Sequence, residues 1–280
     1  MVVGLNYDQI PFINVIKKIG LFVIGVDINN KAPGIKYCDM FYNTSYENYE
    51  KIYLYLKKNK FSSNDYLFTA SSQNSLMSLC KIAKKFNIKF LDFNILDKCI
   101  DKTKMCKLLK KDKILIPNTQ YLVNNKIKID KKKTYFLKSD YGKSPKYCYI
   151  IKNGKIPKFP TKDSFFRKYF LLQEKVNGTH YRINLLRDKM FIFKKKTDRI
   201  CKPDYKFSSF DKSIRVKLRS FSKKYKLNNF LLKFDIIIDN MGWYLIDIGF
   251  DPPKRLEAIM QYKNKNFYKA YVYNWLKNKN

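Results

Sequence analysis

Histidine, arginine and glycine are scarce in this chain. Its 280 residues include one His, seven Arg among 58 basic residues, and nine Gly. A single His and six cysteines without a Cys-x-x-Cys pair provide no ligand set for a structural zinc ion. A chain of this length also does not need a disulfide scaffold. We therefore interpret the cysteines, at positions 38, 80, 99, 106, 148 and 201, as buried, reduced thiols.

Long hydrophobic runs are absent as well. No stretch contains eighteen consecutive apolar residues, so the sequence predicts no transmembrane helix. The first residues, Met1 to Gly4, lead into a strand-like pattern without the basic region that opens a secretion signal. We therefore expect a cytoplasmic protein without a membrane partner.

Acidic residues are few, and the 23 Asp and Glu leave a formal net charge of +35. Such a charge favours nucleic acid as a partner, because Lys and Arg neutralise phosphates. However, 51 of the 58 basic residues are Lys, and Asn, Ile, Tyr and Phe are also abundant, as AT-rich codons favour. Arg carries most bidentate recognition of bases and phosphates. A basic nucleic-acid-binding protein stays an alternative, but we expect no specific nucleic-acid partner.

The rest of the composition is that of a folded protein. Hydrophobic residues make up 45% of the chain and aromatic residues 16%, which suffices for one large or two modest cores. The first hundred residues alternate between short apolar runs and amphipathic stretches. Strands are expected at Met1–Leu5, Leu21–Asp27 and Tyr66–Thr69, and helices at Ile10–Ile19, Tyr49–Lys58 and Leu76–Phe86. This alternation predicts a parallel sheet covered by helices, an α/β domain.

The pattern changes near residue 98, where we place a domain boundary. A helix is expected at Asp101–Lys110, and Pro117 then interrupts the chain. Strands dominate from there, at Thr134–Lys138, Cys148–Lys152, Phe170–Glu174, His180–Leu186, Met190–Lys194, Phe230–Ile238 and Gly242–Ile248. Helices are expected near Lys162–Lys168, at Asp211–Tyr225 and at Asn266–Leu276. Residues 99–280 should therefore form an α+β domain.

Two strand ends in this second region carry residues suited to a nucleotide. Lys138 ends one strand and is followed by the loop segment Gly142-Lys143-Ser144, whose backbone N–H groups could contact phosphates. The strand Leu171–Glu174 ends in a turn at Gly178 and could form a hinge against an adenine ring. Each feature alone also fits an ordinary explanation, namely a solvated lysine or a plain strand exit.

A pair of carboxylates stands out in the last two strands. Asp235 and Asp247 lie inside apolar runs on either side of the turn Asp239–Gly242, so the hairpin brings them to comparable depth. Two facing carboxylates repel and require a cation between them, and oxygen ligands suit Mg²⁺ that also bridges phosphates. The alternative is that one Asp is exposed and the other pairs with a Lys.

The order of these features resembles the ATP-grasp superfamily, close to its carboxylate–amine ligases, over nearly the whole chain. The segments that resemble its first domain are Val2–Asp8, Gly20–Asp27, Ala32–Gly34, Cys38-Asp39 and Ser45. Asp101-Lys102, Pro117, Lys138, Gln173–Gly178 and the Asp235/Asp247 hairpin follow in family order. The resemblance implies a Rossmann-like pre-ATP-grasp domain at 1–98 and an ATP-grasp domain at 99–280. The latter would consist of a small lid subdomain at about 115–172 and a C-terminal subdomain at about 173–280.

The resemblance also implies a role for each matching residue. Lys102 and Lys138 would contact the ATP phosphates, and Asp235 and Asp247 would hold Mg²⁺ or Mn²⁺. Gly142, Lys143 and Ser144 would close over the phosphates, while Gln173, Glu174, Lys175 and Val176 would form the adenine pocket. The implied reaction activates a small carboxylic acid as an acylphosphate. An amine, or as second choice a thiol, then attacks it, with release of ADP and phosphate.

Several positions depart from the family pattern. His180 stands where the family usually has the Glu that binds the ribose, and it can still form a hydrogen bond. Gly249 replaces an Asn metal ligand, and Asp251 replaces an Arg that steadies the phosphates. We expect Asp251 to supply the missing oxygen and Arg255 the catalytic cation. The alternative is a protein that keeps the fold and binds nucleotide or a partner without ligase chemistry.

The basic segment Lys194–Lys196, with Arg199 and Arg255, favours an anionic acid as the substrate. The identity of the acid and the nucleophile stays open at this point, and a homodimer is the working expectation for the assembly.

Overall fold

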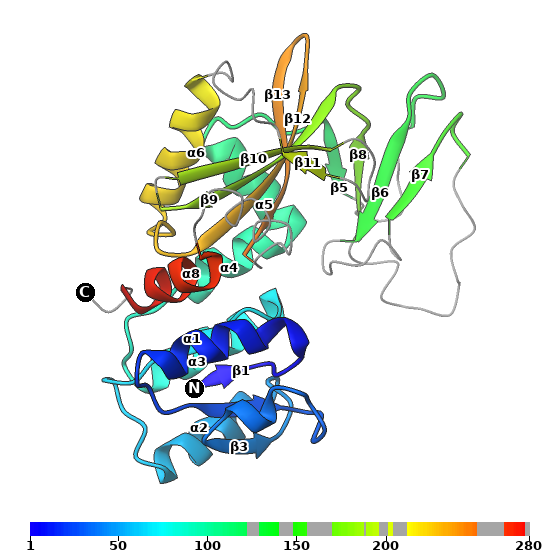
Figure 1. Cartoon of the computed structure of the whole chain (residues 1–280). Helices are drawn as coiled ribbons and strands as arrows, with labels where there is room; N and C mark the ends of the chain where they lie inside the picture. Colours follow the sequence, from blue (N-terminus) through cyan, green and yellow to red (C-terminus); the bar gives the residue numbers. More distant parts are fainter. Residues whose placement is uncertain are drawn as a thin grey trace.

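The computed structural model contains three β-sheets with helices packed around two of them (Figure 1). The structure describes residues 1–121, 129–139, 148–155, 170–187, 189–195, 201–203, 212–250 and 266–277. The expected helix near Lys162–Lys168 lies outside these ranges. Within them, no helix is long and apolar enough to cross a membrane.

The first sheet has the strand order β3-β2-β1-β4, and all its described pairings are parallel. This confirms the parallel sheet predicted for the first hundred residues. The strands are β1 (Val2–Val3), β2 (Ile24–Asp27), β3 (Met40–Asn43) and β4 (Phe68–Thr69). The helices are α1 (Ile10–Lys18), α2 (Tyr49–Lys58) and α3 (Gln73–Lys85). Strand β3 was not expected, because its partly exposed residues show no clean alternation.

Two short helices connect this sheet to the rest of the chain. Helix α4 (Phe93–Ile100) was not expected, whereas α5 (Lys102–Lys111) matches the predicted helix within one residue at each end. Asp101 ends α4 and caps α5, since its Oδ1 accepts a hydrogen bond of 2.9 Å from the Lys104 backbone N–H. Residue 98, our predicted boundary, lies within α4. The division into domains stays a prediction.

The second sheet is antiparallel, with the order β11-β10-β9-β12-β13. Its strands are β9 (Thr179–Leu186), β10 (Lys189–Lys195), β11 (Cys201–Pro203), β12 (Leu231–Asp239) and β13 (Gly242–Gly249). Helices α6 (Lys212–Lys224) and α8 (Phe267–Leu276) accompany it. The turn between β12 and β13 is held by Asp239, whose Oδ1 accepts the N–H groups of Met241 at 2.8 Å and Gly242 at 3.0 Å. Gly242 has φ +142°, a conformation that favours glycine.

The third sheet is smaller and has the order β5-β8-β6-β7. Its strands are β5 (Thr119–Tyr121), β6 (Tyr135–Ser139), β7 (Cys148–Ile151) and β8 (Phe170–Glu174). Tyr135, Leu137, Ile151 and Leu172 form a small hydrophobic cluster of their own there. The parallel first sheet followed by two antiparallel sheets matches the α/β plus α+β architecture that we predicted.

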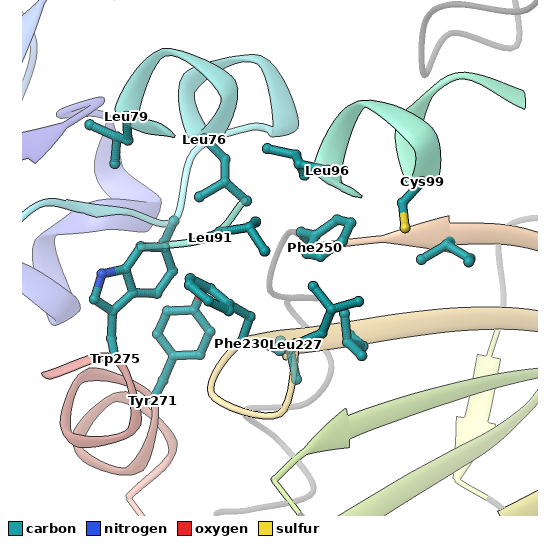
Figure 2. Packing of buried hydrophobic residues seen from close by; sticks show 14 of the residues in the cluster. Leu76, Leu79, Leu91, Leu96, Cys99, Leu227, Phe230, Phe250, Tyr271 and Trp275 are labelled. Atoms are coloured by element: carbon teal, nitrogen blue, oxygen red, sulfur yellow. The ribbon is translucent and has the colours of Figure 1, made fainter. Parts of the chain in front are cut away.

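One large hydrophobic core joins the first sheet's helices to the five-stranded sheet. Figure 2 shows Tyr271 and Trp275 of α8 beside Leu91 and Phe230, with Leu76 of α3 close by. The Trp275 Nε1–H donates a hydrogen bond of 2.5 Å to the buried Leu67 carbonyl, so α8 is also tied to the start of β4. Helix α8 therefore connects the end of the described chain to its beginning.

Five cysteines, Cys38, Cys80, Cys99, Cys106 and Cys148, carry free thiols. Cys80, Cys99 and Cys106 are buried, as we predicted, whereas Cys38 is half-buried and Cys148 is exposed. Cys148 is exposed because β7 is the edge strand of the smallest sheet.

Candidate nucleotide site

The facing carboxylates depend on an irregularity in the β12–β13 hairpin. Counting from the turn, Asp239 pairs with Gly242 and Ile236 pairs with Leu245, so a regular ladder would next place Ile246 opposite Asp235. A register shift between Asp235 and Ile236 instead places Asp247 opposite Asp235. Residues paired in this way share one face of the sheet. The predicted juxtaposition of the two carboxylates is thus confirmed, and a β-bulge, a feature frequent beside active sites, produces it.

The same row of the sheet contains a cation that the sequence analysis missed. Arg182 of β9 lies opposite Asp235, and its guanidinium forms a bidentate ion pair with that carboxylate. The Nε–Oδ1 and Nη2–Oδ2 distances are both 2.7 Å. The Asp235 side chain is only 8% exposed. The signal was present in the sequence, since Arg182 interrupts a strand whose next residues are apolar or amide, but no spacing rule connects it to residue 235.

Lys138 sits at the end of β6 and is held by a chain of hydrogen bonds. Its Nζ donates to Gln173 Oε1 at 2.6 Å, and Gln173 Nε2 donates to Thr119 Oγ1 at 3.2 Å. The Thr119 hydroxyl in turn donates to the Pro117 carbonyl at 2.7 Å. Gln173 and Thr119 are both buried. Gln173, which we assigned to the adenine pocket, therefore positions the ammonium group of Lys138.

Besides burial, the charges of Asp247 and of Lys102 in α5 affect the pKa of Lys138. Burial lowers the pKa of Lys138, and the charge of Lys102 lowers it further, while Cys148 and Asp247 act in the opposite direction. Burial raises the pKa of Asp247, and the charges of Lys102, Lys233 and Lys138 oppose that rise. Lys102 is the first residue of α5, where a helix N-terminus adds positive potential.

The structure therefore brings together four of the predicted site residues from four separate elements. Lys102 comes from α5, Lys138 from β6, Asp235 from β12 and Asp247 from β13. The first sheet also reaches this region, because Gln73 Nε2 of α3 donates to the Ile248 carbonyl, next to Asp247, at 3.4 Å.

The predicted hinge begins at the end of β8, where the Glu174 side chain forms an ion pair. Glu174 pairs with Lys133 at 2.9 Å, and the Lys175 N–H donates to the Thr134 carbonyl at 2.8 Å. Val176 follows in an irregular segment, and His180 lies in β9 opposite Ile237, two residues before Arg182. The Glu174 side chain thus braces the strand end, which leaves contact with an adenine to the backbone and to the residues that follow.

Seven residues named from the sequence lie outside the described ranges. They are Gly142, Lys143 and Ser144 of the phosphate loop, Lys196 and Arg199 after β10, and Asp251 and Arg255 beyond β13. Of the basic segment Lys194–Lys196, the strand β10 includes the first two residues.

Gly178 gives the hinge a testable steric requirement. A Cβ at this position would lie 2.3 Å from the Ile238 carbonyl oxygen and 2.9 Å from Ile237 Cγ2. We predict that Gly178→Ala lowers the free energy of unfolding by about 1–3 kcal/mol, because the β9–β12 pairing must shift. Urea denaturation followed by circular dichroism measures this. Gly20→Asn is the control, since Gly20 has φ +84° and nothing within 4 Å, a setting that Asn tolerates. Equal stability of Gly178→Ala and wild type would contradict the prediction.

The carboxylate pair fits a divalent cation. Burial raises the pKa of Asp247, and the charge of Asp235 adds to that rise. A cation between the two carboxylates would favour their charged forms. A carboxylate oxygen has two lone pairs, so the bonds that Asp235 accepts from Arg182 do not by themselves exclude a metal ion. Mg²⁺ is commonly bound by one or two protein carboxylates together with substrate phosphates. Within the described ranges, no three His, Cys, Asp or Glu side chains form a metal cluster by themselves.

Comparison with known proteins places this geometry in a known fold. No protein-family model matches the chain, and no curated protein sequence matches it. The structure is similar to phosphoribosylglycinamide synthetase from Anaerococcus prevotii, with 17% identity, a TM-score of 0.68, and coverage of 99% of this chain and 74% of that one. It is also similar to L-amino acid ligase from Bacillus licheniformis, with 13% identity, a TM-score of 0.71, and coverage of 99% and 73%.

A third similar structure contains a bound nucleotide. It is the biotin carboxylase domain of 2-oxoglutarate carboxylase from Hydrogenobacter thermophilus, crystallised with MgADP, ADP and bicarbonate. The identity is 13%, the TM-score 0.71, and the match covers 98% of this chain and 69% of that one. The chain thus has the fold that these three enzymes share, and the fold expected from its resemblance to the ATP-grasp superfamily is confirmed.

Proposed function

We propose that this protein is an ATP-dependent ligase that activates a carboxylic acid and joins it to an amine. The observation that carries the proposal is the convergence of Lys102 and Lys138 on the facing pair Asp235 and Asp247. Two cations beside two carboxylates form a site for a phosphate chain and a divalent cation. The shared fold with a synthetase, a ligase and a carboxylase supports this assignment.

The chain's own residues have distinct tasks in this mechanism. Lys138, fixed by Gln173, and Lys102, at the start of α5, bind and orient the nucleotide phosphates. Asp235 and Asp247 would hold Mg²⁺, which supplies charge neutralisation when phosphoryl transfer is in progress. Arg182 keeps the Asp235 carboxylate in one orientation. No side-chain nucleophile is needed, because the substrate carboxylate attacks the γ-phosphate and the amine then attacks the acylphosphate.

The first experiment measures ATP binding to the purified protein by calorimetry, with and without Mg²⁺, beside the variant Asp247→Asn. We predict binding that requires Mg²⁺ and that the variant loses, since the amide carries no charge for the cation. Screening acids and amines for ADP release then follows. ATP binding that depends on neither Mg²⁺ nor Asp247 would indicate a site without ligase chemistry. Absence of ATP binding would contradict the proposal.

The same variant separates a folding defect from a binding defect. Asp247 has a raised pKa in the folded protein, so keeping it ionised opposes folding at every pH above that pKa. Asp247→Asn removes this charge and should raise the melting temperature at pH 7 by a few degrees. The variant would thus be more stable while it binds no MgATP. A lower melting temperature would contradict this explanation.

A further inference from the structure

A cavity lies between helix α8 and the turn that joins β9 to β10. Its volume is about 640 Å³, within the range of small-molecule sites. Its lining includes Arg187, Lys189 and Phe191 from the strand side and Asn266, Lys269 and Tyr273 from the helix side. None of these residues belongs to the nucleotide site described above.

The charged residues that line this cavity in the described part of the chain are all cations. Arg187, Lys189, Lys269 and Lys277 supply four cations, and no carboxylate is among the lining residues. Asp188, which lies between Arg187 and Lys189 in the sequence, is outside the described residues. Asn266 caps α8 with its side chain, so the positive end of the helix lies at the same cavity.

Arg187 is held in place by a buried polar side chain. Its Nε donates to Oδ1 of Asn274, which is 4% exposed, and Asn274 Nδ2 donates to the Asn229 carbonyl at 2.6 Å. Arg187 also has φ +53°, an uncommon conformation for a residue with a side chain. The contact with Asn274 uses Nε, so the four N–H groups on the two Nη atoms remain outside it. A fixed guanidinium of this kind suits a phosphate or a carboxylate.

The cavity also has an apolar wall. Phe191 and Ala270 contribute to it, and Tyr273 is 43% exposed although it belongs to an apolar helix. Helix α8 packs its other side, including Tyr271 and Trp275, into the main core. Lys269 Nζ lies 5.8 Å from the Tyr273 ring centre, so the two side chains form a cation–π contact.

The two sites are separate along β9. Leu186 at the cavity lies four residues from Arg182, which corresponds to roughly 13 Å of strand. Paired and alternate residues share a face, so Leu186, Phe191 and Arg182 lie on the same side of the sheet. A ligand in this cavity would therefore lie beside the nucleotide site without occupying it.

We propose that this cavity binds a small organic phosphate that carries an apolar or aromatic group. The phosphate would sit between Arg187 and the surrounding lysines, and the apolar group would contact Phe191 and Tyr273. The inference does not depend on the proposed ligase activity, because it uses none of the residues assigned to nucleotide or metal.

The test uses 4-fluorophenyl phosphate as the probe and ¹⁹F NMR titration of the full chain as the measurement. The double variant Lys189→Gln/Lys269→Gln removes two exposed charges at the cavity. The control Lys57→Gln/Lys58→Gln removes two exposed charges from the end of α2, so both variants have the same net charge. Lys138→Met disables the nucleotide site separately.

We expect saturable binding by wild type that weakens at least about tenfold in the cavity variant. The α2 control and Lys138→Met should bind within about twofold of wild type, and 4-fluorophenol, which lacks the phosphate, should not bind. Absence of saturable binding, an equal loss in the α2 control, or a loss caused by Lys138→Met would each overturn the proposal. The last outcome would place the probe in the nucleotide site instead.

Discussion

Arg182→Met is expected to lower the free energy of unfolding by about 3–5 kcal/mol, because it leaves the buried carboxylate of Asp235 without its partner. The substitution keeps much of the side-chain volume and removes both 2.7 Å hydrogen bonds. A lysine ammonium near the carboxylate cannot reproduce the bidentate geometry of a guanidinium. Urea denaturation at pH 7, followed by fluorescence and circular dichroism together, measures the loss.

Two further variants show whether the ion pair causes the effect. Arg219→Met removes an exposed arginine of α6 and should change stability by no more than about 0.5 kcal/mol. The double variant Arg182→Met/Asp235→Leu removes both charges and should recover most of the loss, since a packed apolar pair can replace a buried ion pair. A cost below 1 kcal/mol for Arg182→Met alone, or no recovery in the double variant, would be inconsistent with the explanation.

The recovered double variant also has a functional use. It should fold with near wild-type stability but lack one of the two carboxylates that we assign to Mg²⁺. Loss of Mg²⁺-dependent ATP binding in that variant would then reflect the ligand set alone. The comparison therefore separates the structural task of Asp235 from its proposed task at the metal.

The spacing of apolar residues in the sequence predicted those elements that bury one face and expose the other. Helix α2 begins and ends at the predicted residues, Tyr49 and Lys58, and it buries Ile52 and Leu56, which lie one turn apart. Strands β12 and β13 were similarly clear, since Ile, Leu and Trp dominate them and a turn with Asp239 and Gly242 separates them. Local chemistry was enough in these cases.

Elements defined by tertiary contacts were missed for a physical reason. Strand β3 has only partly buried residues and becomes a strand by pairing with β2. Helix α4 is eight residues long, and its apolar residues Leu96, Cys99 and Ile100 are fixed by packing against the main core. Such short segments have little stability without their surroundings, so their sequence carries a weak signal.

The candidate site was foreseen only in part. Counting from the turn placed Asp235 and Asp247 at comparable depth, but a regular ladder would pair Asp235 with Ile246. The bulge that brings Asp247 opposite Asp235 is a matter of local ladder geometry. The contacts of Arg182 with Asp235, and of Lys138 with Gln173, join residues 53 and 35 positions apart in the sequence. No local pattern predicts such contacts, because they depend on strand order. The roles assigned to these residues stay predictions.

Lys138→Met should weaken MgATP binding by about 10- to 100-fold, since it removes a charge-assisted contact to the phosphates. The buried Gln173, itself bonded to Thr119, fixes the ammonium group of Lys138, and methionine cannot form this contact. Lys57→Met is the matched control, because Lys57 is exposed at the end of α2 and no assigned site residue belongs to that helix. It should bind within about twofold of wild type. Calorimetry with MgATP measures both.

The pH dependence of binding gives a second readout for the same residue. Burial lowers the pKa of Lys138, so its ammonium group loses its proton at a lower pH than an exposed lysine does. Affinity for MgATP should therefore fall as pH rises through that lowered pKa, and the fall should be absent in Lys138→Met. An identical alkaline profile in wild type and variant would show that another group binds the phosphates. Wild-type affinity in Lys138→Met would remove Lys138 from the nucleotide site.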